Sequence, residues 1–163
     1  MKSIQNFGLI LSLSFIAGGA AFAELKVGDS ATYVGEMSGQ QFDRVVTVTA
    51  ATAGNPVVTV HEAISMNGQV LSEQDSSYDS SKDDLYAQTA TDAGFCSRVG
   101  QANQGVGVIE QFTLATSGVT LTTCHLTLND GSEFWLGNVP FGTVKVIRPD
   151  SELAIMMVSF VKQ

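Results

Sequence analysis

The chain has 163 residues, of which 44% are hydrophobic, and it carries 8 Lys and Arg against 16 Asp and Glu. Its formal net charge of −8 argues against nucleic acid and anionic lipid headgroups as partners, because both present negatively charged phosphates. The length suits a single folded domain with one hydrophobic core.

The first 23 residues have the pattern of a cleavable secretory signal peptide. One cation, Lys2, precedes an apolar run from Phe7 to Ile16, and the segment ends on small residues around Ala23. We therefore expect a mature domain of residues 24–163 that is periplasmic or secreted and has no stable membrane anchor. Loss of Lys2 leaves 7 cationic against 16 acidic side chains, so the side-chain charge becomes 7 − 16 = −9.

Alternating Val- and Thr-rich stretches predict strands in the first half of this domain, at residues 31–37, 41–51, 57–66 and 69–73. The Asn67-Gly68 pair between the last two predicts a hairpin, because the turn that joins such strands needs positive φ at both central residues.

The acidic, serine-rich segment 75–84 predicts a mobile loop or a short capped helical turn, after which residues 85–91 could resume a strand. Asp75, Asp79 and Asp83 are four positions apart, whereas a calcium loop of EF-hand type needs ligands at alternate positions around a central glycine. We expect no metal site here.

The two cysteines of the chain indicate how the next segments pair. Residues 107–115 and 119–128 alternate like strands and are separated by Thr116-Ser117-Gly118, which predicts an antiparallel hairpin carrying Cys124. Cys96 is expected on the preceding strand. In a cytosolic protein both thiols would stay reduced and buried, but the signal peptide favours a Cys96–Cys124 disulfide.

The remaining chain predicts strands at 133–136, 143–148 and 153–162, and no long run has the helix period. Nine or ten short strands at this spacing predict an all-β fold. We expect a curved antiparallel sheet in the form of a half-barrel or barrel, with a β-sandwich as the alternative.

The tail Phe134-Trp-Leu-Gly-Asn-Val-Pro-Phe-Gly-Thr-Val-Lys-Val146, with the hydrophobic strand behind it, resembles the closing strands of exported carriers of the LolA and LolB type. That resemblance implies a curved half-barrel covered by short helices, with an acyl chain or another apolar ligand in its concavity. The sequence itself predicts no covering helices, and no arginine matches the motif of that family.

Large apolar side chains are the remaining signal for a binding site. They either line a cavity for an apolar ligand or fill the core, and a packed core is the usual role of such residues in a small β domain. The predicted ligand-binding residues are Phe112, Trp135, Phe141 and Met156.

The sequence offers little for catalysis. Cys124 and His125 are adjacent, so on a strand they point to opposite faces, and His61-Glu62 fails for the same reason. Gly28-Asp-Ser30 resembles the nucleophile block of GDS-type esterases, but Thr122 stands where their Asp-x-x-His motif would need an aspartate before His125. We expect no catalytic residues, metal or cofactor.

Three hypotheses follow for the function. The first is an exported module that holds a lipid or another apolar ligand in a concave sheet, which requires an unfilled cavity. The second is a periplasmic protein-interaction or inhibitor domain with a filled core that acts through loops or an exposed sheet edge. The third is an enzyme in which a histidine meets a carboxylate in a cleft.

Overall fold

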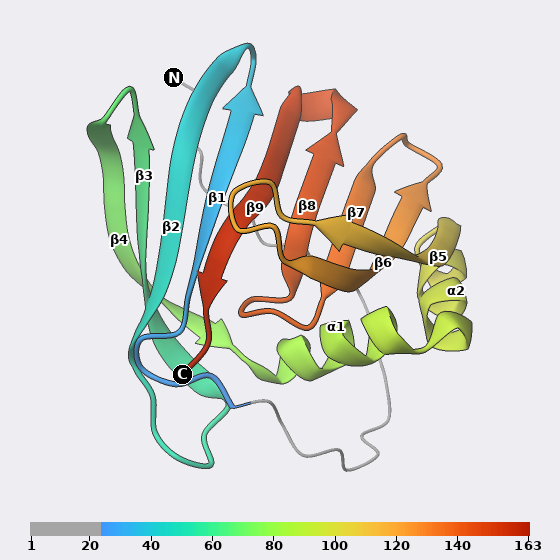
Figure 1. Ribbon diagram of the computed structural model, residues 1–163, viewed down its shortest axis with the longest axis horizontal. Helices are drawn as coiled ribbons and strands as arrows, with labels where there is room; N and C mark the ends of the chain where they lie inside the picture. The colour runs from blue at the N-terminus through green and yellow to red at the C-terminus, as the bar shows by residue number, and fades with distance from the viewer. Residues whose placement is uncertain (1–23) are drawn as a thin grey trace.

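Nine antiparallel strands form one sheet in the computed structural model, which describes residues 24–163 (Figure 1). The predicted signal peptide falls on residues 1–23, outside the described part. The strands are β1 (Ser30–Met37), β2 (Gln40–Ala50), β3 (Val57–Met66), β4 (Gln69–Asp79), β5 (Gly105–Thr113), β6 (Thr120–Leu128), β7 (Glu133–Gly137), β8 (Thr143–Arg148) and β9 (Leu153–Val161).

The strand order is β4-β3-β2-β1-β9-β8-β7-β6-β5, so β4 and β5 are the two edges and the first and last strands pair in the middle. The sheet is curved and not closed. The prediction of an all-β fold with one curved antiparallel sheet is thereby confirmed, and the sheet is open rather than closed into a barrel. The β-sandwich alternative is wrong, because all nine strands belong to one sheet.

Two helices join β4 to β5, α1 (Ser81–Thr91) and α2 (Ala93–Ala102), where the sequence predicted a resumed strand and a strand carrying Cys96. Those two predictions are wrong. The Asp92 carboxylate accepts a hydrogen bond of 2.9 Å from the Phe95 backbone N–H, which satisfies an otherwise unpaired donor at the start of α2.

The strand β4 is longer than predicted. It continues to Asp79, beyond the predicted end at residue 73, because it stays paired with β3 along its whole length.

The pairing register divides the strand side chains between two faces, since directly opposite residues share a face. We call the first the helix face, because residues from α1 and α2 are buried against it in one cluster with Leu126 and Phe134. One row across this face consists of Gly107, Leu126, Phe134, Val146, Ile155, Gly35 and Phe42.

We call the second the open face, because in the described part of the chain no helix packs on it. One row runs across all nine strands of this face. It consists of Val70, Ser65, Asp43, Val34, Met156, Lys145, Trp135, His125 and Val108.

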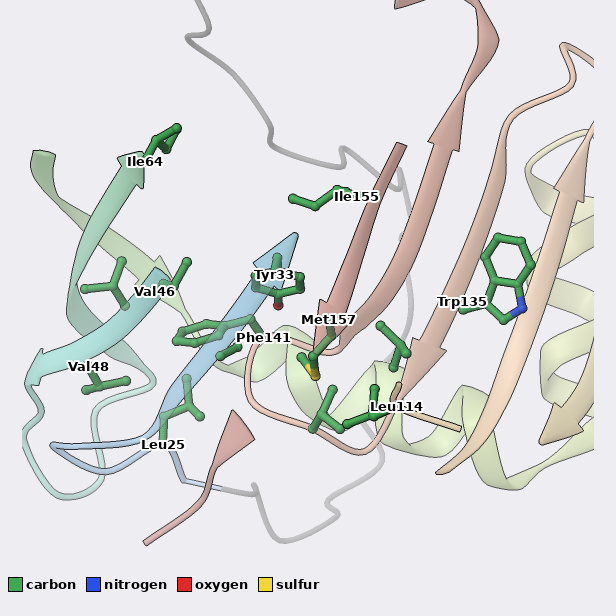
Figure 2. Packing of buried hydrophobic residues seen from close by; sticks show 14 of the residues in the cluster. Leu25, Tyr33, Val46, Val48, Ile64, Leu114, Trp135, Phe141, Ile155 and Met157 are labelled. Carbon is green, nitrogen blue, oxygen red and sulfur yellow. The ribbon is translucent and has the colours of Figure 1, made fainter. Parts of the chain in front are cut away.

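The core lies mainly on the helix face. Tyr33 and Met157 are almost completely buried, and the β7–β8 loop inserts Phe141 beside them (Figure 2). Leu114, at the end of the β5–β6 hairpin, is fully buried in the same cluster. A second cluster joins the helices to β6 and β7. No helix among residues 24–163 has the length and apolar character needed to cross a membrane.

A disulfide holds α2 on the helix face, as the cysteine spacing and the signal peptide predicted. It joins Cys96 of α2 to Cys124 of β6, with the two Cα atoms 5.7 Å apart. Gly107 of β5 allows this close approach, because a Cβ atom there would lie 2.1 Å from the Cys96 carbonyl oxygen.

The helix α1 is attached to the sheet through the buried carboxyl of Asp83. Its Oδ1 accepts a hydrogen bond of 2.5 Å from the Tyr78 hydroxyl, and its Oδ2 accepts one of 3.1 Å from the Phe141 backbone N–H. The rings of Tyr78 and Phe141 pack edge to face with centroids 5.3 Å apart. Burial raises the pKa of Asp83 to about 7, although both hydrogen bonds oppose that shift.

We expect the stability of the domain to fall as the pH rises from about 4 to about 7 and to level off above that value. The folded state keeps the Asp83 proton up to about pH 7, whereas the unfolded chain loses it near its ordinary pKa of 3.8, so deprotonation favours unfolding. Between about pH 5 and pH 8 the loss is about 2 kcal/mol relative to Asp83→Asn, which cannot titrate. Urea unfolding of both proteins across this range measures the difference, and two parallel pH profiles would rule out the proposed burial.

Candidate functional site

The charged side chains of the sheet are segregated between its two faces. Among the strand residues, Glu62 is the one carboxylate on the helix face, where Oε1 pairs with Arg44 Nε at 2.5 Å. Lys145 is the one Lys or Arg that the described strands carry on the open face, since Arg44 and Arg148 lie on the helix face. The open-face carboxylates are Glu36, Asp43, Glu73, Asp75, Asp79, Glu110 and Glu133. The open face is therefore strongly negative.

A surface groove of about 630 Å³ is lined by residues of β1, β2, β8, β9 and the β3–β4 turn, and most of its strand residues point to the open face. Val34, Ala154 and Met156 form an apolar part of its lining, and the carboxylates of Glu36 and Asp43 are part of the same lining. The lining also includes Gln41 and Lys145 from the open face, Gly35, Phe42 and Ile155 from the helix-face row, and Asn67 and Gly68 from the β3–β4 turn. The groove thus combines apolar contact area with negative charge, which suits a partner that carries apolar and cationic groups together.

Next to the groove, several side chains of the open face pack around Trp135. The His125 ring stacks on the indole with centroids 3.9 Å apart, and the Lys145 ammonium lies 4.4 Å from the indole centroid. The indole N–H donates a hydrogen bond to Glu110, while His125 Nε2 lies 2.8 Å from Glu133 Oε2. These contacts engage both carboxylates, so the accessible negative charge of this face lies toward β1–β4.

Three of the four predicted ligand-binding residues belong to one hydrophobic cluster, with Trp135 and Phe141 among its buried members and Phe112 packed against it. Trp135 and Phe141 are buried, and Phe141 packs against Tyr78 rather than against Trp135. Phe112 is half-buried, with its ring centroid 6.4 Å from that of Trp135. Met156 alone of the four lines the groove. A ligand-binding role for these residues remains a prediction.

The remaining residues considered from the sequence are scattered over the sheet. His61 and Asp75 pair on the open face, with Nδ1 and Oδ1 2.8 Å apart, and Ser30 begins β1 opposite Thr47. Asp79 accepts hydrogen bonds from the backbone N–H and the hydroxyl of Ser81, which begins α1. Within residues 24–163, no three His, Cys, Asp or Glu side chains gather in a way that could hold a metal ion.

The negative face is the feature that the sequence analysis missed. Alternation within each strand places Glu73 and Asp75 on one face of β4, but it does not show that Asp43 and Glu36 share that face. The pairing of β1 with β2, of β2 with β3 and of β3 with β4 supplies this information.

Comparison with known proteins identifies no family. No family model and no curated protein matches the chain. A crystal structure of MucB is similar at a TM-score of 0.46 and 12% identity, over 86% of this chain and 55% of that chain. A crystal structure of MucB in complex with MucA(peri) gives 0.42 and 11%, over 84% and 50%. This chain spans about half the length of those chains.

Proposed function

We propose that this chain is an exported protein-interaction module whose open face is the contact surface. The observation that carries the proposal is the charge segregation, which leaves accessible carboxylates and an apolar groove together on a face without a covering helix. A filled core supports it as well, because Tyr33, Phe141 and Met157 occupy the space that a carrier would keep for its ligand.

Site-specific crosslinking tests this function. A photo-reactive amino acid at Val45, which is exposed on the open face, is expected to give a discrete crosslinked protein product in the cells that naturally export the chain. The same group at Gln101, exposed on α2, is the matched control and is expected to give none. Equal products from both positions, or none from Val45, would contradict the proposal.

The apolar ligand predicted from the sequence is a second candidate, and Val34, Ala154 and Met156 in the groove are the observation that favours it. Native and denaturing mass spectrometry of the mature protein, purified without detergent, distinguishes the two functions. A native mass that exceeds the denatured mass by a lipid-sized increment would identify a carrier. Equal masses are expected for a protein-interaction module.

A further inference from the structure

The edge strand β4 presents an unpaired backbone ladder along its outer side. Among residues 24–163 its strand partner is β3 alone, and every residue from Gln69 to Asp79 except Tyr78 is exposed. The strand contains no Pro and no Lys, which natural edge strands commonly use against pairing with another chain. Its free N–H and C=O groups can therefore accept a further strand.

The side chains of β4 restrict which strand can be accepted. Glu73 and Asp75 both point to the open face, where Asp75 Oδ1 also lies 2.8 Å from His61 Nδ1. Residues two apart on a strand lie about 7 Å from each other. An added strand with Lys or Arg at alternate positions matches this spacing, so its cations would lie opposite the two carboxylates. Val70 and Leu71 are 55% and 51% exposed at the beginning of β4 and offer apolar contact to one end of that strand.

The alternatives fit this edge less well. Edge-to-edge pairing of two copies through β4 would bring Glu73 and Asp75 against carboxylates of the same sign, which is unfavourable. At the opposite edge, α2 packs against β5, and the Glu110 side chain, held by Trp135 and His125, is only 39% exposed, whereas Asp75 is 68% exposed beside His61. Charge complementarity therefore selects β4 and a cationic partner.

We propose that β4 binds an extended cationic segment of another exported protein, with Lys or Arg at alternate positions, as an additional strand of the sheet. This inference rests on the proposed interaction function and adds the chemistry of the partner and the mode of binding. Backbone hydrogen bonds supply affinity in this mode, and the alternating carboxylates supply selectivity.

Synthetic peptides test this mode on the mature protein. One peptide alternates lysine and threonine, a second has the same composition with all lysines before all threonines, and a third is the alternating peptide with N-methyl groups on alternate backbone nitrogens. The alternating peptide is expected to bind about fivefold more tightly than the block peptide, and N-methylation is expected to abolish binding. Equal affinity of the first two peptides would show that binding depends on the net charge of the peptide and not on the spacing of its lysines, and it would overturn the proposal.

A pair of protein variants locates the peptide. Glu73→Gln with Asp75→Asn is expected to weaken binding of the alternating peptide about tenfold. Asp150→Asn with Glu152→Gln removes the same charge from an exposed turn and is expected to change the affinity less than about twofold. Equal effects of the two variants, or NMR amide shifts away from β4, would contradict binding at this edge.

The results separate this inference from the proposed function. A protein crosslink from Val45 that persists in Glu73→Gln with Asp75→Asn would leave the interaction function standing and exclude the β4 edge as its site. Peptide binding that depends on β4, without any crosslink from Val45, would support the edge mode and contradict the open face as the contact surface.

Discussion

Replacing both Cys96 and Cys124 by serine is expected to lower the free energy of unfolding by about 3–4 kcal/mol. The disulfide closes a loop with a sequence separation of 28, so its removal returns conformational freedom mainly to the unfolded chain. It also releases α2, which lies against Gly107 at a distance that leaves no room for a Cβ atom. Urea unfolding of the variant beside the oxidised wild type measures the loss.

The wild type in a strong reductant is the control for this experiment, because it lacks the bridge but keeps both sulfur atoms. It is expected to unfold at nearly the same urea concentration as the double variant. An oxidised wild type with the same midpoint as both would show that the bridge contributes nothing to stability.

Trp135→Ala is expected to cost about 3–5 kcal/mol, as is usual for truncation of a buried large aromatic side chain. The indole is only 6% exposed, and its loss would leave a cavity beside His125 and remove the ring over which the Lys145 ammonium lies. Glu110 would also lose the donor that its carboxylate accepts from. Urea unfolding followed by far-ultraviolet circular dichroism measures the effect, since the variant lacks the single tryptophan of the chain.

Trp135→Phe separates the two contributions. Phenylalanine keeps most of the packed volume but cannot donate to Glu110, so we expect a smaller loss of about 1–3 kcal/mol. Near-wild-type stability of Trp135→Ala would show that the cluster around the indole is loosely packed. It would then favour the sequence-based prediction that Trp135 lines a ligand cavity.

The strands were predictable because each carries its own period. Asn67-Gly68 marked the β3–β4 hairpin, and both residues have positive φ in the structure, at 53° and 75°. The helices were not predictable by the same reasoning. The buried positions of α1 are Asp83, Tyr86, Thr89 and Ala90, which follow the helix period. Two of these four residues are polar, so a search for periodic hydrophobic residues does not detect the helix.

The helix α2 was not predicted for a different reason. It has only ten residues and contains Gly94 and Gly100, which lower helix propensity, so its position depends on the Asp92 cap and on the disulfide. The candidate site depended on tertiary pairing in the same way. Val34 and Met156 become neighbours only when the first and last strands meet, which no local pattern reveals.

The central pairing of β1 with β9 has a consequence for how the domain folds. β1–β4 form one meander and β5–β9 another, and each can assemble through pairing between strands that are near in sequence. Among the described residues, β1–β9 is the one strand pairing that joins them, and closing so long a loop is entropically costly and slow. We therefore expect the rate-limiting step to be the docking of the two meanders. A chain emerging N-terminus first would have to wait for its last strand before the sheet is complete.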